Sequence, residues 1–342
     1  MKLVCHIGSP KTASTFLQNT LALNPDWLRA HGVMYPDLLA PDANHITLFY
    51  AAANYIHDFA RGYGLHTQED VDKFRDRLSE TIARQVAEAP EGVHTMVMSS
   101  ENLVANLRGR VGVQNLAELL RPHFDDIRIV IYLRRQDDAI LSMYGEFMRR
   151  GFSDATFEQF MERVLGGGPV MPYLAYEDLL KQWIAVFGRK AITVRLFDRK
   201  RMRGGDILSD FMAQVLGEVP QDIAGLTPSQ EDNIGLSAPA LEFLRRMQPH
   251  LPFIKDGKVN PVRARLQKRI NELPSKPRPR MTAEQSQRVM EHFRSSNEWL
   301  GKAFFPKRKG PIFPVRTDLP ETSNLGRVTL VQFAKFAGSL LE

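Results

Sequence analysis

The chain has 342 residues, 43% of them hydrophobic, with a net charge of +6 and a single cysteine, Cys5. This length and apolar content suffice for one large globular domain, or for one domain with a substantial annex. One cysteine excludes an internal disulfide and suits a reducing compartment. No stretch approaches the ~20 apolar residues that span a bilayer, and the apolar start is too short for a secretory signal. We therefore expect a cytoplasmic protein without a transmembrane segment.

The first two thirds of the chain alternate short apolar runs with helical patterns. Four runs are predicted as strands, at residues 3–7, 93–98, 127–133 and 192–197. Short β-branched runs separated by helices are typical of an α/β fold with a parallel sheet and helices on both faces. We expect this core to cover residues 1–217.

A long crossover separates the first two predicted strands. Residues 24–92 form a predicted helical insertion, which includes a helix over 68–89 that starts with Thr67 and Asp70 in a capping-box pattern. We expect this insertion to form a lid or an acceptor wall beside the loop that follows the first strand.

The C-terminal third is different in pattern and in charge. Beyond about residue 218 the strand-like runs stop, while helical patterns remain at 237–247 and 282–303, with prolines interrupting the chain between them. We interpret residues 218–342 as a largely helical, basic region packed on the core.

Most of the positive charge lies in this region. Residues 245–310 hold 17 Lys and Arg against 5 Asp and Glu, a local net charge of +12 that leaves −6 for the rest of the chain. This charge fits an anionic partner, such as a nucleotide, an acidic acceptor or a membrane surface bound peripherally, and it equally fits a solvated helical face. Nucleic acid is the least favoured partner, because no zinc-finger, helix-turn-helix or RNP motif accompanies the charge.

The segment between the first predicted strand and the next helical run has the pattern of a phosphate-binding loop. It reads His-Ile-Gly-Ser-Pro-Lys-Thr-Ala-Ser-Thr over residues 6–15. Gly8 and Thr15 match the first glycine and last hydroxyl of the common nucleotide-binding loop, but Ala13 and Ser14 replace its Gly-Lys pair and Lys11 comes three positions early. A loop that opens a helix still offers N–H donors to an anion. We interpret it as a cradle that suits a compact anion better than a triphosphate with magnesium.

A second motif follows the third predicted strand. That strand runs into Arg134 and Arg135, and the helical pattern after them carries Ser142. A guanidinium at a strand end and a hydroxyl on the facing helix can chelate a phosphate dianion. The two motifs stand about 120 residues apart, in the order that the two ends of a doubly wound sheet require. The alternative for these arginines is a surface ion pair with Asp137 or Asp138.

Together the motifs resemble those of bacterial sulfotransferases that use 3′-phosphoadenosine 5′-phosphosulfate (PAPS), whose loop reads roughly Pro-Lys-Thr/Ser-Gly-Ser/Thr-Thr. The resemblance implies a P-loop NTPase-like sulfotransferase fold and PAPS as donor. It also implies that the 3′-phosphate is bound by Arg134 and Ser142, and the phosphosulfate by Pro10, Lys11, Thr12, Ala13, Ser14 and Thr15. The family usually has glycine where this chain has Ala13. We expect helical φ there, so that the extra methyl group is tolerated.

The resemblance implies transfer of a sulfuryl group to a hydroxyl or amine, with adenosine 3′,5′-bisphosphate as leaving group. Lys11 suits stabilisation of the transferred charge, and no metal is demanded, because sulfuryl carries less charge than a terminal phosphoryl group. Related enzymes carry a catalytic His or Glu after the second of the predicted strands, which points to Glu101 as general base. Glu101 could instead cap the next helix or pair with an arginine. His45 is the rival base.

Two other functions stay open. One is a P-loop kinase that acts on a small molecule, and the other is a non-catalytic nucleotide-binding protein of the same fold, for which Ala13 is the sequence hint. The acceptor can be a saccharide, a lipid-linked glycan, a phenol or a peptide, and the sequence specifies no oligomeric state.

Overall fold

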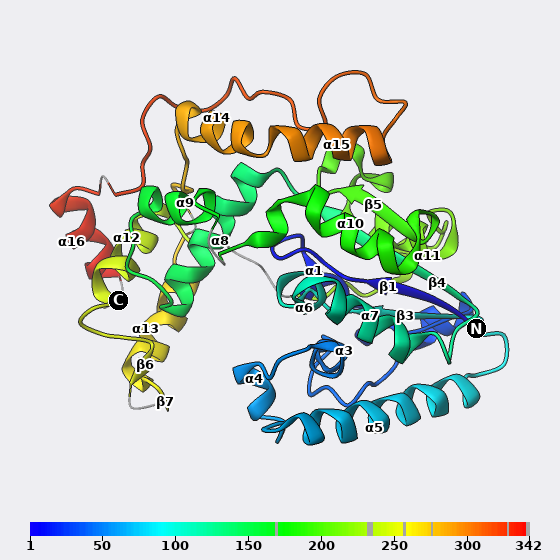
Figure 1. Ribbon diagram of the computed structural model, residues 1–342. Coiled ribbons are helices and arrows are strands. Elements are labelled where there is room, and N and C mark those ends of the chain that lie inside the picture. Colours follow the sequence, from blue (N-terminus) through cyan, green and yellow to red (C-terminus); the bar gives the residue numbers. More distant parts are fainter. Residues whose placement is uncertain (168–169, 231–234, 256–257, 275, 327, 340–342) are drawn as a thin grey trace. The chain divides into compact units, whose positions relative to one another are not determined.

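A computed structural model describes residues 1–167, 170–230, 235–255, 258–274, 276–326 and 328–339 (Figure 1). The chain divides into two compact units. The first comprises Met1–Arg134 and Tyr176–Glu231, and the second comprises Arg135–Ala175 and Asp232–Glu342.

The first unit is built on a five-stranded parallel sheet in the order β2-β3-β1-β4-β5. The strands are β1 (Lys2–His6), β2 (Val33–Met34), β3 (Thr95–Ser99), β4 (Asp126–Leu133) and β5 (Ile192–Leu196). The four predicted strands are confirmed, with bounds shifted by at most two residues. The edge strand β2 was missed, because two residues are too few to show a strand pattern. It lies in the insertion predicted to be helical, over residues 24–92.

Helices flank this sheet and connect its strands (Figure 1). They are α1 (Ser14–Leu23), α2 (Pro25–Ala30), α3 (Ile46–Ala52), α4 (Asp58–Arg61), α5 (Gln68–Ala87), α6 (Asn102–Ala105), α7 (Gly109–Leu120), α10 (Tyr176–Phe187) and α11 (Ile207–Leu216). The predicted cap of α5 is confirmed, since Thr67 and Asp70 form a complete capping box. The parallel sheet flanked by helices confirms the α/β class.

Both faces of the sheet are buried, as its apolar runs predicted. On one face Val130 and Tyr132 of β4 belong to a core cluster with Leu17 of α1 and Phe211 of α11. Successive strand residues point to opposite faces, so Ile131, which is also fully buried, faces the other layer. Near-continuous apolar strands are the pattern expected for a sheet that is covered on both sides.

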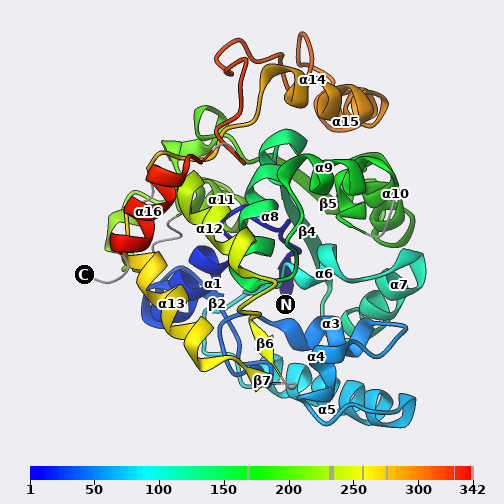
Figure 2. The same ribbon diagram turned by 90° about the vertical axis from the view of Figure 1, so that its left-hand side faces the viewer.

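The second unit is largely helical, as predicted for the C-terminal third. Its elements are α8 (Gln136–Arg150), α9 (Phe157–Leu165), α12 (Ala238–Met247), α13 (Pro261–Glu272), α14 (Ala283–His292), α15 (Arg294–Phe304) and α16 (Leu330–Ser339), with a short hairpin of β6 (Ile254–Lys255) and β7 (Lys258–Val259). The helix predicted over 282–303 is two helices, α14 and α15, which meet at Phe293 (Figure 2). Helix α13 was missed because Pro261 suggested a break, whereas it occupies the first helical turn after the Asn260 cap.

The boundary between the units differs from the predicted one. Residues 135–175 were expected in the sheet domain, but they cluster with the C-terminal helices. The reason is that α8 packs against α12 and α14, which come roughly a hundred or more residues later in the chain. Contacts between elements so distant in sequence leave no local pattern by which the boundary could be predicted.

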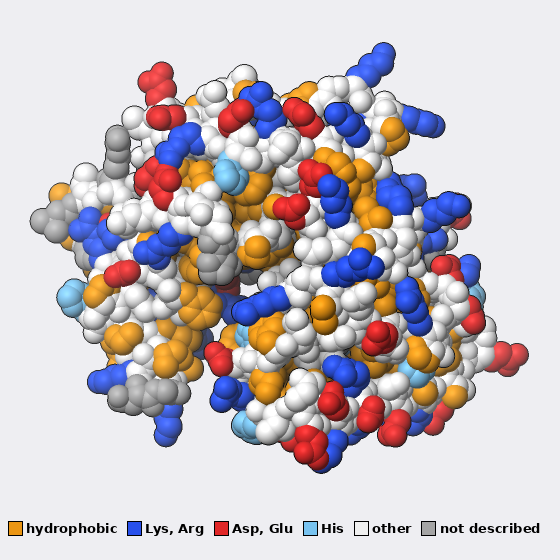
Figure 3. Space-filling view, viewed as in Figure 1, with side chains coloured by type: hydrophobic (Ala, Val, Ile, Leu, Met, Phe, Trp, Pro, Cys, Tyr) orange, Lys and Arg blue, Asp and Glu red, His pale blue; other side chains and the backbone are white. Residues whose placement is uncertain are grey.

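Part of the basic charge of the second unit is compensated locally. Arg245 and Arg246 both pair with Glu242, and Arg288 pairs with Glu158. On the face drawn in Figure 3, Lys and Arg side chains are interspersed with Asp and Glu. Among the residues that the structure describes, none of the helices combines the length and apolar character that crossing a bilayer requires.

Candidate functional site

The loop between β1 and α1 is shaped by three left-handed residues. Gly8, Lys11 and Ala13 have φ angles of 66°, 67° and 62°. When left-handed residues alternate with others, successive backbone N–H groups turn toward one side and form an anion-binding concavity. Helix α1 begins directly after this loop, and within the described part of the chain no side chain caps its N-terminus. Its first amides and the positive end of its dipole therefore face the loop.

The backbone of Ala13 corrects one expectation. The position was predicted to be helical, but its φ of 62° and ψ of 30° place it in the left-handed region. The left-handed conformation is about 1–2 kcal/mol less favourable for alanine, whereas glycine adopts it without this strain. The Ala13 carbonyl accepts the hydrogen bond of the Leu17 amide at 3.1 Å, which is the first backbone hydrogen bond of α1.

The loop side chains divide into those that build the loop and those available to a ligand. The buried Thr12 hydroxyl donates to the Ser9 carbonyl at 2.7 Å, so it closes the loop. The Ser14 hydroxyl is buried and has no hydrogen-bond partner in the described residues. Thr15 is exposed on the first turn of α1, while Pro10 and Lys11 are half-buried. A buried hydroxyl without a partner is costly, so Ser14 marks a place where a ligand can accept a hydrogen bond.

Arg134 reaches this loop from the neighbouring strand. Because β1 and β4 are adjacent and parallel, their carboxyl ends meet at one edge of the sheet. Arg134 Nη1 donates to the Lys11 carbonyl at 3.1 Å, and its guanidinium carbon lies 5.8 Å from the centre of the Phe197 ring. The Arg134 carbonyl accepts a hydrogen bond from the Tyr176 hydroxyl. The fold thus brings together two motifs that are 123 residues apart.

The ion-pair alternative applies to the next arginine. Arg135 Nη2 lies 2.9 Å from Oδ2 of the fully buried Asp137, and the Ser286 hydroxyl donates to the same carboxylate at 2.6 Å. Burial alone raises the pKa of Asp137, but Arg135 and Ser286 outweigh it and hold that pKa below its ordinary value. Ser142 is half-buried on α8 in the second unit, and its role with Arg134 stays a prediction.

Glu101 lies against the loop between β1 and α1, just after the end of β3. A β-carbon on Gly8 would come within 2.6 Å of Glu101 Cα and Cβ. Glu101 holds the N-cap position of α6, yet its carboxylate makes no capping bond. Gln18 Nε2 donates to Oε2 at 2.9 Å and Asn44 Nδ2 donates to Oε1 at 3.1 Å. No lysine or arginine pairs with it among the described residues, so neither sequence alternative for Glu101 accounts for its carboxylate.

Gln18 and Asn44 were not predicted as site residues. Gln18 follows Ser14 by four positions on α1, so the two share one face of the helix, which was the available signal. Asn44 had no signal except its place beside His45. Its Oδ1 is buried without a partner in the part of the chain described, close to the Glu101 carboxylate. Two hydrogen-bond acceptors at one place suit a ligand that brings O–H or N–H donors.

The geometry of His45 does not fit a general base. Its Nε2 donates to the Pro36 carbonyl at 2.9 Å, and its Nδ1 accepts from the Ser99 amide at 3.1 Å. The ring is 2% exposed and stacks on Tyr35 with centroids 4.4 Å apart. Burial lowers the pKa of His45 to about 4 despite the Pro36 bond, which acts in the opposite direction. With both nitrogens bonded to backbone, His45 fixes the end of β3 and has no lone pair left for a substrate proton.

The site therefore combines a loop with the backbone shape of an anion-binding concavity and a carboxylate beside it. Lys11 and Arg134 bring two positive charges to the loop, and Glu101 brings one carboxylate to its other side. Such a site can bind a phosphate- or sulfate-bearing ligand and take a proton from a group beside it. Within the residues described, three or more His, Cys, Asp or Glu side chains do not gather as metal ligands anywhere.

Comparison with known proteins finds similar chains, among them a curated protein and a solved structure. No protein-family model matches the chain. An uncharacterized protein from Archaeoglobus fulgidus is 30% identical over 215 residues, which are 61% of this chain and 54% of that protein, so the match spans about half of the relative's length. The crystal structure of a sulfotransferase from Alicyclobacillus acidocaldarius is 18% identical and gives a TM-score of 0.43, with coverage of 67% of this chain and 85% of that chain. The fold assignment rests on this chain's own strand order and parallel pairing.

Proposed function

We propose that this protein is a sulfotransferase that moves a sulfuryl group from PAPS to a hydroxyl or amine. The observation that supports this most is the position of the loop between Arg134 and Glu101. Arg134 bonds the Lys11 carbonyl on one side, and Glu101 lies against Gly8 on the other. Sulfuryl transfer needs these three elements together: an anion cradle, a second cation for the nucleotide, and a base next to the transferred group.

Each side chain then has a defined task. When bound, PAPS supplies an activated sulfuryl group, whose sulfur–oxygen bond to the bisphosphate breaks as the bond to the acceptor oxygen or nitrogen forms. Lys11 and the N-terminus of α1 stabilise the negative charge left on the leaving oxygen, and the Ser14 hydroxyl donates to the same group of oxygens. Arg134 binds the 3′-phosphate, for which Ser142 is the predicted second donor.

The acceptor's proton goes to Glu101. Gln18 and Asn44 hold both carboxylate oxygens by amide donors, which orients the group without neutralising it by a cation. The Asn44 Oδ1 atom, which has no partner among the described residues, can accept a hydrogen bond from a second donor on the acceptor molecule. This suits an acceptor with neighbouring hydroxyl or amine groups, of which a saccharide is one.

Nucleotide binding separates this function from a P-loop kinase. In a thermal-shift titration we expect adenosine 3′,5′-bisphosphate to stabilise the protein, and ATP with magnesium to do so much less. Stabilisation by ATP with magnesium alone would favour the kinase. PAPS turnover is then measured over saccharide, phenol and amine acceptors. Tight bisphosphate binding without any product would favour a non-catalytic nucleotide-binding protein.

Four variants test the roles within the site. Lys11→Ala should lower turnover about 10²-fold or more, the scale for removal of a charge-stabilising donor, with a smaller loss of bisphosphate affinity. Arg134→Ala should mainly reduce bisphosphate affinity, whereas Arg128→Ala, at the exposed far end of the same strand, should leave it unchanged. Glu101→Gln should abolish most turnover while bisphosphate binding persists. Normal rates in this variant would refute Glu101 as the base.

A further inference from the structure

An exposed surface of the second unit combines apolar and basic side chains at the β6–β7 hairpin and the adjoining helix α13. The two strands pair antiparallel, with Ile254 opposite Val259 and Lys255 opposite Lys258. Opposed side chains share one face of a hairpin, and successive residues point to opposite faces. One face of the hairpin is therefore apolar, and the other carries two lysines. The name hairpin face is used below for the exposed residues Ile254, Lys255, Lys258, Val259, Val262, Arg265 and Lys268.

The apolar part of the hairpin face consists of three aliphatic side chains. Ile254 and Val259 are each 51% exposed, and Val262, on the first turn of α13, is 50% exposed. Single exposed aliphatic residues are common on protein surfaces, but these three lie within nine positions of the chain. An exposed apolar patch with a polar rim is typical of a surface that binds a protein or a membrane.

The positive charge of the hairpin face is not compensated locally. Residues 254–271 hold six Lys and Arg against one acidic residue, Asp256, which lies outside the described residues. Four of the six are exposed and have no ion-pair partner in the part of the chain that the structure describes: Lys255, Lys258, Arg265 and Lys268. The arginines of α12, by contrast, both pair with a glutamate. At the place of β6 and β7 in Figure 3, hydrophobic and Lys or Arg side chains lie next to one another.

Contacts within the second unit hold the hairpin face in place. The Asn260 amide donates to the Phe253 carbonyl at 2.8 Å, which continues the hairpin pairing, and the Asn260 side chain caps α13 by accepting from the Val262 amide at 3.1 Å. The buried Arg263 donates to the Met148 carbonyl of α8 at 3.3 Å. The apolar and basic side chains are thus presented by a folded surface, and a partner does not have to order it on binding.

We propose that the hairpin face binds the surface of an anionic lipid bilayer. Ile254, Val259 and Val262 enter the boundary between the headgroups and the acyl chains, and the basic side chains bind the phosphate and carboxylate groups of the lipids. The long lysine stems let the ammonium groups reach the headgroups while the opposite face of the hairpin is buried. Such a bilayer is negative at its surface and apolar beneath, so it complements both parts of the hairpin face.

This partner accounts for more of the hairpin face than a nucleic acid does. A nucleic acid would match the positive charge, but it would leave the three aliphatic side chains in water. The residues of the hairpin face have no part in the proposed sulfuryl transfer. If PAPS turnover is never observed, binding to anionic vesicles is still expected.

Sedimentation of the full chain with lipid vesicles tests the proposal. At about 0.15 M salt, we expect vesicles of phosphatidylcholine with about 30% phosphatidylserine to bind at least tenfold more tightly than pure phosphatidylcholine, and about 0.5 M salt to remove most of this binding by screening. Equal binding to both kinds of vesicle, or binding to neither, would overturn the proposal. Binding to a labelled DNA duplex without binding to vesicles would also overturn it, in favour of a nucleic-acid partner.

Basic residues of the hairpin face are tested by removal of charge. The joint change Lys255→Gln and Lys258→Gln should weaken binding to the anionic vesicles about 25-fold, because each basic residue near such a surface strengthens binding about fivefold. The joint change Lys190→Gln and Lys307→Gln is the matched control, since it removes the same charge from two exposed lysines elsewhere. If both double variants bind alike, net charge and not the hairpin face determines binding, and the proposal is wrong.

The apolar residues are tested in the same way. Ile254→Ser together with Val259→Ser should weaken vesicle binding about tenfold or more, because less apolar surface leaves water. The matched control joins Val111→Ser to Val331→Ser, at valines that are 51% and 63% exposed. Circular dichroism confirms the fold of each variant. Unchanged binding of the Ile254 and Val259 variant would show that the hairpin does not enter the bilayer, which contradicts the proposal.

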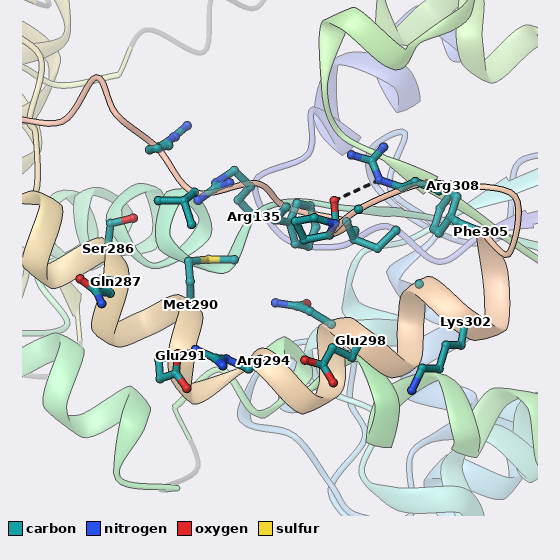
Figure 4. A pocket seen from close by; sticks show the side chains of 18 of the residues that line it. Arg135, Ser286, Gln287, Met290, Glu291, Arg294, Glu298, Lys302, Phe305 and Arg308 are labelled. Atoms are coloured by element: carbon teal, nitrogen blue, oxygen red, sulfur yellow. Dashed lines mark hydrogen bonds and ion pairs between the residues drawn. The ribbon is translucent and has the colours of Figure 1, made fainter.

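A cavity elsewhere in the second unit is the competing lipid site. It has a volume of about 770 Å³, lies between α14, α15 and the segment 305–316, and is lined in part by Met290 and Phe305 (Figure 4). This volume is large enough for a small ligand, but no residue of the hairpin face lines the cavity. Met290→Asp puts a charge into its wall and should leave vesicle binding unchanged. Loss of binding in this variant, with normal binding in the hairpin variants, would place the lipid in the cavity and refute the proposal.

Discussion

The contact between Gly8 and Glu101 can be tested by adding one methyl group. Gly8→Ala places a β-carbon 2.6 Å from Glu101 Cα and Cβ, at a φ of +66°. Gly109 has the same φ of +66°, but no described atom lies within 4 Å of the point that its β-carbon would occupy, so Gly109→Ala imposes the backbone strain without the clash. Comparison of Gly8→Ala with Gly109→Ala therefore separates the clash with Glu101 from the backbone strain.

The magnitudes follow from these geometries. A left-handed alanine costs about 1–2 kcal/mol, and the stiffer unfolded chain offsets about 0.4–1 kcal/mol of that, so Gly109→Ala should lower the free energy of unfolding by at most about 1.6 kcal/mol. Gly8→Ala adds an overpacking cost of about 1–3 kcal/mol, because the atoms that must move include backbone. We expect Gly8→Ala to lower the free energy of unfolding by about 1–5 kcal/mol in total.

Urea unfolding followed by tryptophan fluorescence measures the difference, since Trp27 and Trp183 both belong to the first unit. Gly8→Ala should also displace Glu101 and reduce PAPS turnover, while Gly109→Ala leaves turnover near normal. Equal midpoints for the two variants would show that Gly8 and Glu101 are not in contact, and the arrangement of the site would have to be revised.

Four further variants test other parts of the structure. Ala13→Gly should raise the free energy of unfolding by about 0.5–1 kcal/mol, because the relief of left-handed strain exceeds the cost of the more flexible unfolded chain. If urea unfolding showed the variant to be less stable, it would contradict the left-handed conformation of Ala13. Gln18→Leu should lower kcat roughly 10- to 100-fold, because it removes a hydrogen bond to the charged Glu101, at unchanged bisphosphate affinity. A loss of bisphosphate affinity at normal kcat would argue against this. The pKa of buried His45 is lowered from 6.5 to about 4, so the unfolded chain takes up a proton first and this ring alone lowers the stability by about 3 kcal/mol as pH drops from 6.5 to 4. Buried His6, whose pKa is lowered to about 3, contributes in the same direction. His45→Asn should therefore reduce the slope of pH-dependent unfolding, and an unchanged slope would exclude a neutral buried His45 ring. Asp137→Asn should lower the free energy of unfolding by about 3 kcal/mol, because Arg135 loses its buried partner. A melting temperature within 1 °C of that of the unchanged protein would refute the Arg135–Asp137 pair.

Much of the fold could be predicted because its signals are local. The strands β1, β3, β4 and β5 are short apolar runs, and the Thr67 and Asp70 cap marks the start of α5 within four residues. The exceptions also have local reasons. Strand β2 is two residues long, and α13 starts at a proline that also fits a break. Patterns of this kind depend on neighbouring residues, which the sequence displays directly.

The candidate site was predictable only in part. The loop and Arg134 follow strands whose ends meet in any parallel sheet of this order, so their proximity followed from the topology. The topology does not predict which loop hydroxyl is available to a ligand. The Thr12 hydroxyl donates to the Ser9 carbonyl, while the Ser14 hydroxyl has no partner among the described residues. The orientation of a hydroxyl depends on atoms that surround it in space.

The sequence by itself determined the parallel strands, the phosphate-loop pattern and the arginine at the end of β4, since each is a local pattern or a strand-end position. Only the tertiary structure decided that Ala13 is left-handed, that both nitrogens of His45 bind backbone, and that Gln18 and Asn44 hold Glu101. The contacts of His45 and Glu101 join residues 9 to 83 positions apart, and Ala13 adopts a backbone conformation that alanine rarely takes. Long-range packing selects among conformations that the local sequence leaves open.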